Sequence, residues 1–277
     1  MARRFDGQVV FITGASSGIG AALARRFAAE GAHLVLSARR VERLERLAAE
    51  LTSEGGQAIA VPCDVTREGD VEAAAARARQ RFGRVDVVVA NAGFGVVGPF
   101  ERLTLDDYRR QFETNVFGVL RTVYATLDDL MRSRGRLVLI GSVLGHLSTP
   151  RSSPYAMSKF AVRALAKALV HELRPHGIAV VHVSPGPVRS ELRQVDNRGV
   201  FHAEIRDPVP RWLCMPADRA ARQIVRAVAR RRSEQVITAV GKVSVTVEHH
   251  APWALATAIR LLGVRGRPEP ARRPARS

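Results

Sequence analysis

The sequence predicts an α/β fold: a doubly wound, mostly parallel sheet of seven strands with helices on both faces. Short apolar runs alternate with longer amphipathic stretches through most of the 277 residues. The apolar runs are continuous rather than alternating, which is typical of parallel strands buried between two helix layers. The first run leads directly into a glycine-rich turn and a helical stretch. Such alternation implies right-handed crossovers and hence one open sheet.

The apolar, β-branched runs define the predicted strands, at residues 8–12, 33–37, 58–62, 85–90, 136–141 and 178–183, with a weaker one at 235–239. Amphipathic periodicity predicts helices at residues 18–30, 41–54, 67–82, 104–132, 154–174 and 217–231. Because no internal repeat or long linker divides these elements, residues 1–250 are predicted to form one domain.

Two segments depart from this rhythm. Residues 190–216, which we call the lid segment, show no clear period and contain several prolines. Long loops of this kind often cover a binding site, so we expect the lid segment to border the substrate. Residues 251–277 are predicted to begin with an apolar helix over 251–262 and to end in a basic, disordered tail.

The composition limits the possible partners. Lys and Arg number 43 against 26 Asp and Glu, for a net charge of +17, which raises the question of nucleic acid. The arginines are scattered through the helical stretches and only 5% of residues are aromatic, which is poor for stacking bases. We therefore expect no specific nucleic-acid partner, and keep a basic nucleic-acid-binding protein as a minor alternative.

The chain shows no sign of export or of a membrane span. The first apolar run is short and is preceded by Asp6 and Gly7, unlike a secretory signal. No apolar run is long enough to cross a bilayer. The two cysteines, Cys63 and Cys214, form neither a disulfide framework nor a metal set. We expect a cytoplasmic protein without a metal site.

The stretch TGASSGIG, residues 13–20, predicts a pyrophosphate site. A strand, a tight glycine turn and a helix N-terminus together offer free N–H groups and a favourable dipole to an anion. The spacing is G-x-x-x-G-x-G, and the alternative is a glycine turn without a ligand. The residues predicted to hold the phosphates are Gly14, Ser16, Ser17, Gly18, Ile19 and Gly20.

The end of the second predicted strand indicates the cofactor. NAD-binding chains carry an acidic residue near this point, which accepts from the ribose hydroxyls. None lies between His33 and Val41, and Arg39 stands 19 residues after Gly20. A guanidinium binds a phosphate bidentately, so the sequence predicts NADP(H), with Arg39 on the 2′-phosphate and Arg40 close by. The alternative is that both are ordinary surface arginines.

Two more strand ends carry candidate cofactor residues. Asp64 and Val65 follow the third strand, where Asp64 can accept from the adenine amino group. Asn91, Ala92 and Gly93 follow the fourth strand. A small turn at the carboxyl edge of a sheet leaves space for a flat ring.

The stretch SPYAMSK sets Tyr155 four residues ahead of Lys159, on one face of a predicted helix. Alone, such a pair is ordinary helix surface. A free tyrosine ionises at about pH 10, and a cationic neighbour lowers that value. Tyr155 can then act as a general acid when a carbonyl is reduced and as a base in reverse.

Taken in order, TGASSGIG, Asn91-Ala92-Gly93, Ser142, Tyr155-x-x-x-Lys159 and Pro185-Gly186 resemble the short-chain dehydrogenase/reductase family. The resemblance covers roughly residues 6–240 and implies a Rossmann fold in a single domain.

The family resemblance also implies roles for individual residues. It adds Asn115, in NVFG, to Ser142, Tyr155 and Lys159 as a catalytic set. Asn115 is expected at a mid-helix irregularity, anchoring a water linked to Lys159, which also binds the nicotinamide ribose. Ser142 is expected to hold the substrate oxygen. The residues expected to border the nicotinamide are Pro185, Gly186, Val188 and Ser190.

The expected reaction is hydride exchange between a nicotinamide and a small carbonyl or alcohol substrate. The candidate substrate walls are mostly apolar: Phe94, Val143, Leu144, His146, Leu147, Val195, Val200, Phe201, Ile205 and Trp212. A homo-oligomer, dimer or tetramer, is expected. The C-terminal helix either covers the cleft, packs in that oligomer or lies on an anionic membrane surface. The main alternative function is an NADPH-binding sensor or scaffold without turnover.

Overall fold

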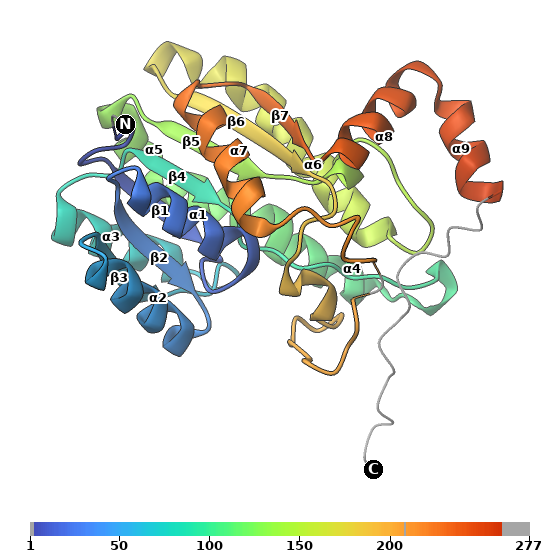
Figure 1. Cartoon of the computed structure of the whole chain (residues 1–277), viewed down its shortest axis with the longest axis horizontal. Helices are drawn as coiled ribbons and strands as arrows, with labels where there is room; N and C mark the ends of the chain where they lie inside the picture. The colour runs from blue at the N-terminus through green and yellow to red at the C-terminus, as the bar shows by residue number, and fades with distance from the viewer. Residues whose placement is uncertain (1–2, 208, 262–277) are drawn as a thin grey trace.

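The seven strands form one sheet in the order β3-β2-β1-β4-β5-β6-β7, with every neighbouring pair parallel (Figure 1). This computed structural model describes residues 3–207 and 209–261. The predicted doubly wound sheet is therefore confirmed. The strand bounds are β1 Val9–Thr13, β2 His33–Ala38, β3 Gln57–Pro62, β4 Val87–Ala90, β5 Arg136–Ile140, β6 Ala179–Pro185 and β7 Glu234–Ile237.

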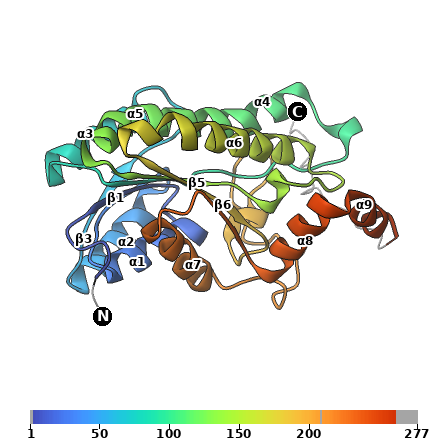
Figure 2. The same cartoon turned by 90° about the horizontal axis from the view of Figure 1, so that it is seen from above.

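Helices cover both faces of the sheet (Figure 2). Those on one face are α3 Asp70–Phe82, α4 Leu105–Phe112, α5 Gly118–Ser133 and α6 Ser153–Glu172. Those on the other face are α1 Gly18–Ala29, α2 Val41–Ser53 and α7 Ala217–Ala229. Among the described residues, short 3₁₀ turns occupy Phe100–Arg102, Val143–Gly145, Arg174–His176 and Glu191–Gln194.

The central strands are apolar throughout because both of their faces are covered. In β1, Val10 and Ile12 belong to the core under α1 and α7, whereas Val9 and Phe11 belong to the core under α3, α5 and α6. All four side chains are at most 1% exposed. Successive residues of a strand point to opposite faces, so a run without polar positions is what a sheet between two helix layers requires.

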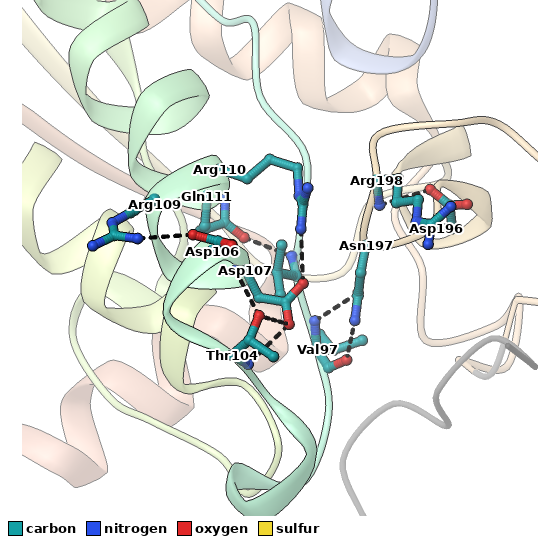
Figure 3. A network of polar contacts seen from close by, with 11 residues as sticks. Val97, Thr104, Asp106, Asp107, Arg109, Arg110, Gln111, Asp196, Asn197 and Arg198 are labelled. Carbon is teal, nitrogen blue, oxygen red and sulfur yellow. Dashed lines mark hydrogen bonds and ion pairs between the residues drawn. The ribbon is translucent and has the colours of Figure 1, made fainter. Parts of the chain in front are cut away.

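The helix predicted over 104–132 is present and contains a π turn. After α4, residues Glu113–Phe117 form a π-helical turn before α5 begins. A capping box fixes the start of α4, since Thr104 Oγ1 accepts from Asp107 N and the Asp107 carboxylate accepts from Thr104 N (Figure 3). A π turn adds one residue to a turn, which leaves the amphipathic pattern on either side intact and therefore escapes a search for periodicity.

The chain after β7 forms two helices, α8 Ala239–His250 and α9 Pro252–Leu261, which extend from one end of the domain (Figure 1). Helix α9 agrees with the apolar helix predicted from residue 251, whereas α8 was not predicted. Thr238 caps α8 by accepting from Gly241 N at 3.0 Å. The predicted disordered tail lies outside the described residues. Within the described ranges, every helix is too short or too polar to cross a bilayer.

The side chain of Asp86, just before β4, stabilises the start of β1, and this role can be tested by substitution. Its carboxylate is 4% exposed and accepts from Val9 N at 2.8 Å. Asp86→Ala leaves that buried N–H without a partner, so we expect a loss of about 1–3 kcal/mol in the free energy of unfolding. Thermal denaturation should show a melting point several degrees lower. Asp128→Ala, at an exposed position of α5, is the control, and an equal shift in both variants would contradict this role of Asp86.

Candidate active site

The carboxyl ends of four neighbouring strands bring the predicted site residues to one edge of the sheet. The turn after β1 and the turn after β4 are joined directly. Asn91 Nδ2 donates to Thr13 O at 3.0 Å and to Gly14 O at 3.1 Å. Asn91 N and Ala92 N donate to Thr13 Oγ1 at 3.1 and 3.3 Å. Asn91 therefore holds the start of the glycine turn in place, and its side-chain NH₂ group is used in these bonds.

The glycine turn after β1, which we call the cradle, leaves no room for a side chain at three of its positions. Gly14 has a φ of +69°, and a Cβ there would lie 2.8 Å from Ala92 Cα. A Cβ at Gly20 would lie 2.3 Å from Gly14 O. A Cβ at Gly18, which also has a positive φ, would lie 3.0 Å from Ser190 Cβ. Partly exposed backbone beside the N-terminus of a 12-residue helix suits a pyrophosphate. Ser190 of the lid segment faces this turn, and its expected contact with the nicotinamide stays a prediction.

Arginines at the end of β2 surround the same turn. Arg40 reaches it directly: Arg40 Nη2 donates to Ser17 Oγ at 2.7 Å and to Ser16 Oγ at 3.2 Å. Arg39, the residue predicted to bind the 2′-phosphate, is exposed and donates to Gly199 O at 3.1 Å. Arg40, and not the predicted Arg39, is therefore the arginine that contacts the serines of the glycine turn.

The residues after β3 are held by local contacts. Asp64 Oδ1 accepts from Thr66 N at 3.0 Å and from Thr66 Oγ1 at 2.8 Å. Val65 is buried, and its carbonyl accepts from Arg121 at 3.1 Å. The proposed contact of Asp64 with an adenine amino group stays a prediction.

The tyrosine and lysine of the SPYAMSK stretch lie together in the first two turns of α6. Lys159 Nζ is 5.7 Å from the centroid of the Tyr155 ring and donates to Ile140 O at 2.9 Å. The lysine is only 5% exposed, whereas Tyr155 is half-buried. Ser142 follows the end of β5, and hydrogen bonding to its hydroxyl partly offsets the rise that burial causes in the pKa of Tyr155. Its Oγ also accepts from Leu144 N at 3.1 Å, which fixes the start of the following 3₁₀ turn.

Burial shifts the pKa of both groups. It lowers the pKa of Lys159 to about 8, because an ammonium loses hydration inside the protein. It also raises the pKa of Tyr155, and the opposing effects of the Ser142 hydrogen bond and the Arg193 charge are smaller. The sequence led us to expect a lowered tyrosine pKa. In the protein without a cofactor, the loss of hydration dominates. The pKa of Lys159 is therefore closer to neutral pH than the pKa of Tyr155.

Asn115 lies on the π turn, so the irregularity expected there is present. The side chain is fully buried and clamps the loop after β4: Oδ1 accepts from Phe94 N at 3.1 Å and Nδ2 donates to Phe94 O at 3.0 Å. Nδ2 also donates to Ser158 Oγ at 3.1 Å. A Cβ at Gly93 would lie 3.0 Å from Asn115 Oδ1 and 3.8 Å from Lys159 Nζ. Gly93 therefore lies next to both Asn115 and Lys159. The expected water link between these two side chains stays a prediction.

The end of β6 closes the edge on the far side. Pro185 is the last residue of the strand, and a Cβ at Gly186 would lie 2.2 Å from Thr238 Oγ1, at the start of α8. Val188 is 3% exposed and forms a parallel bridge with Met215, at the other end of the lid segment. The backbone that is expected to border the nicotinamide is therefore tightly held.

The lid segment is attached on both sides of the site. Asn197 pairs with the loop after β4, accepting from Val97 N at 3.0 Å and donating to Val97 O at 2.8 Å (Figure 3). Within the segment, the Arg193 guanidinium binds Asp207 through two bonds of 2.6 and 2.7 Å. Glu191 binds Arg40 and Arg43, so the lid segment reaches from the start of α2 to the loop after β4.

The predicted substrate walls divide into two groups. Phe94 and Leu147 are each 6% exposed, and the backbone of Phe94 is held by Asn115. Val200 and Trp212 are 52% and 81% exposed, so neither lines a closed wall in this structure. The ring of Phe201 lies 5.4 Å from the Arg43 guanidinium carbon, at the β2 end of the edge. Sequence order alone could not separate these positions, because the lid segment has no regular structure.

Four polar residues of the site were not predicted: Arg43, Glu191, Arg193 and Asn197. Arg43 lies in the first turn of α2, three residues after the N-cap residue Arg40. The other three belong to the lid segment, where no periodicity indicates which side chains point inward.

The fold and this edge define a nucleotide-binding oxidoreductase of the Rossmann type. A family model described as short chain dehydrogenase matches residues 8–200, and the chain belongs to this family. The family's members use a nicotinamide cofactor and oxidise CH–OH groups or reduce the corresponding carbonyls.

Curated relatives and solved structures agree with this family. L-fucose dehydrogenase from Oryctolagus cuniculus is 38% identical over 192 residues, covering 69% of this chain and 66% of that protein. Dehydrogenase/reductase SDR family member 7 from Homo sapiens is 38% identical over 190 residues, covering 66% of this chain and 56% of that protein. Oxidoreductase UcpA from Salmonella typhimurium is 37% identical, covering 69% and 73%. The match to the first two spans less than two thirds of their length.

Two similar solved structures hold different cofactors. An alcohol dehydrogenase from the archaeon Thermococcus sibiricus, complexed with 5-hydroxy-NADP, has a TM-score of 0.74 and 32% identity, covering 84% of this chain and 97% of that one. A short chain dehydrogenase/reductase from Burkholderia phymatum, in complex with NAD, has a TM-score of 0.80 and 28% identity, covering 97% and 99%.

The buried lysine should make stability depend on pH. In the folded protein the pKa of Lys159 is about 8, against an ordinary value of 10.5. Below pH 8 both states are protonated and the buried ammonium costs stability in full. Between these values only the unfolded chain keeps the proton, so the free energy of unfolding rises with pH.

We expect the cofactor-free wild type to gain about 1–3 kcal/mol relative to Lys159→Met between pH 7 and 10.5. Denaturant titrations at each pH measure the difference. Lys242→Met, at an exposed position of α8, is the control. Parallel pH curves for wild type and Lys159→Met would show that the ammonium is not penalised by burial.

Proposed function

We propose that this chain is an NADP(H)-dependent oxidoreductase that interconverts a carbonyl and a secondary alcohol on a small, apolar or lipid-like substrate. The observation that carries the proposal is the meeting of Tyr155, Ser142 and Lys159 at the same sheet edge as the glycine cradle. A proton donor next to a dinucleotide cradle is the arrangement that hydride transfer to a carbonyl needs.

Tyr155 serves as the general acid in reduction and the general base in oxidation. Its hydroxyl, held by Ser142, delivers a proton to the substrate oxygen as that oxygen gains charge. The nicotinamide supplies or accepts the hydride when bound. The positive charge of Lys159 favours the phenolate and so opposes the effect of burial on Tyr155. Asn115 keeps the backbone at Phe94 in place, and with it one side of the substrate space.

Two observations support NADP(H) over NAD(H). No acidic residue stands between His33 and Val41 to accept from the ribose hydroxyls. Arg40 donates to Ser16 and Ser17, while Arg39 contacts Gly199 and Arg43 contacts Phe201 at the same corner, so a 2′-phosphate here gains charge-assisted hydrogen bonds. In this role the arginines act with the serines of the cradle, and Arg40 is the closest of them.

The apolar side chain of Phe94, whose backbone is held by Asn115, supports an apolar substrate. Exposed apolar side chains on α8 and α9, including Val243 and Trp253, suit a homo-oligomer contact or a membrane surface. A cytoplasmic location fits two free, buried cysteines. The alternative function is an NADPH-binding sensor or scaffold, and turnover separates the two.

Tyr155→Phe separates an enzyme from a sensor. The variant removes one hydroxyl and no packing volume, so we expect turnover to fall by at least about a hundredfold while NADPH still binds with wild-type affinity. Reduction of a panel of ketones and aldehydes, followed by nicotinamide absorbance, measures turnover, and fluorescence titration measures binding. Retained turnover would eliminate Tyr155 as the acid. Tyr124→Phe, at an exposed position of α5, is the matched control.

Arg39→Asp and Arg40→Ala test the cofactor assignment. Both remove a positive charge beside the predicted 2′-phosphate site, so we expect the dissociation constant of NADPH to rise about tenfold or more. The dissociation constant of NADH should change far less. Arg46→Ala, at an exposed position of α2, is the control. If either variant weakens both cofactors equally, the arginine concerned does not read the phosphate.

A further inference from the structure

We propose that Glu191 is a resident anion in the 2′-phosphate pocket, and that a bound 2′-phosphate displaces it and thereby releases the lid segment. This inference rests on the proposed NADP(H) function. It adds a residue that couples the identity of the cofactor to the position of the lid, and it names Arg40 and Arg43 as the shared partners of carboxylate and phosphate.

The carboxylate of Glu191 is bound by two guanidinium groups. Arg40 Nη1 donates to Glu191 Oε2 at 2.7 Å. Arg43 Nη1 donates to Oε1 at 2.6 Å and to Oε2 at 2.8 Å. Burial raises the pKa of Glu191, but the hydrogen bonds from Arg43 and Arg40 outweigh it and hold the pKa below its ordinary value. The group is therefore a carboxylate at neutral pH.

The same guanidinium that holds Glu191 also touches the cradle. Arg40 donates to Glu191 through Nη1 and to Ser17 and Ser16 through Nη2. Arg40 thus joins the cradle to the lid segment, and an anion that takes Arg40 from the cradle side acts on the lid segment as well.

Further contacts seat the same part of the lid segment on this corner. The ring of Phe201 lies 5.9 Å from the Arg40 guanidinium carbon and 5.4 Å from that of Arg43. Arg39 holds the backbone at Gly199. The side chains of Glu191, Arg40 and Arg43 are only 28%, 34% and 32% exposed. Partly buried ion pairs are screened by salt less than exposed ones, so this contact persists at physiological ionic strength.

Charge decides which anion occupies the pocket. Two guanidinium groups around one carboxylate leave a local charge of +1, whereas a phosphate close to its dianionic form neutralises both. Phosphate also offers three acceptor oxygens to the N–H groups that Glu191 now uses. The cofactor that lacks the 2′-phosphate presents a hydroxyl instead, which has no charge to displace the carboxylate. NADP(H), but not NAD(H), therefore opens this contact.

A competing internal anion reduces the apparent affinity for the ligand. If the contact is closed about nine-tenths of the time, the apparent dissociation constant is about ten times the intrinsic one. Removing the charge of Glu191 removes this competition for a ligand that carries the phosphate and for no other. We therefore predict that the substitution raises the affinity for the phosphate-carrying ligand, whereas a substitution that only disrupts the site lowers it.

The test compares adenosine 2′,5′-bisphosphate with adenosine 5′-monophosphate on the full chain, using Glu191→Gln. We expect calorimetric titration to show the bisphosphate binding about tenfold more tightly to the variant than to the wild type, with the monophosphate unchanged. Glu204→Gln, whose carboxylate is 75% exposed on the same segment, is the matched control and should leave both constants unchanged. A variant that binds the bisphosphate no better than the wild type overturns the inference.

Two outcomes separate this inference from the proposed function. If the wild type favours the bisphosphate but Glu191→Gln does not improve it, the resident anion is wrong and the NADP(H) assignment stands. If neither the wild type nor Glu191→Gln favours the bisphosphate over the monophosphate, the NADP(H) assignment fails and the inference fails with it.

Hydrogen exchange supplies a second measurement. Amides of residues 191–202 should exchange severalfold faster in the wild type once the bisphosphate is bound, and in unliganded Glu191→Gln. The monophosphate should leave them unchanged. Slower exchange on binding the bisphosphate would mean that the phosphate tightens the lid segment instead of releasing it.

Discussion

The shared direction of the seven strands is the constraint on which the site depends. Because every pair is parallel, the residues that leave β1, β4, β5 and β6 all emerge at one edge. Gly14, Asn91, Ser142 and Gly186 come from segments far apart in the chain, yet all four follow a strand end. The bonds from Asn91 to the carbonyls of Thr13 and Gly14 make two of these strand ends into a single rigid piece. Such rigidity suits a cradle that must hold a dinucleotide beside a proton donor.

The burial of Lys159 shows how stability and function oppose each other at this edge. An ammonium that donates only to one carbonyl among the described contacts is costly in a dry site, as its lowered pKa indicates. In the proposed function the same charge acts on the nearby phenol, because charges interact more strongly where water is excluded. Sites that perform chemistry commonly retain groups that are poorly placed for stability.

The regular elements were largely predictable, and the failures have physical causes. Buried strands and amphipathic helices leave a periodic pattern, so the sheet, α1, α2, α3, α6 and α7 follow from the sequence. Helix α8 does not, because its stretch GKVSVTVEHH is rich in β-branched residues that favour strands. Its first turn is instead fixed by tertiary packing, with a Cβ at Gly241 only 2.8 Å from Val143 Cγ1. Likewise, motif order predicted that Tyr155, Lys159 and the glycines lie at one edge of the sheet, where the structure has them, and their roles stay predictions. Which of two adjacent arginines reaches the cradle depends on the backbone of the turn, which motif order does not show.

The π turn at Glu113–Phe117 has a consequence for how this chain can evolve. A π turn takes up one extra residue while the helix faces on either side stay in register, so deleting one position here would restore an unbroken α-helix and leave Val119 and Val123 in the core. The bulge that carries Asn115 would be lost, and with it the bonds through which that side chain braces the loop after β4. A one-residue deletion in this stretch would therefore spare the fold and disrupt the site.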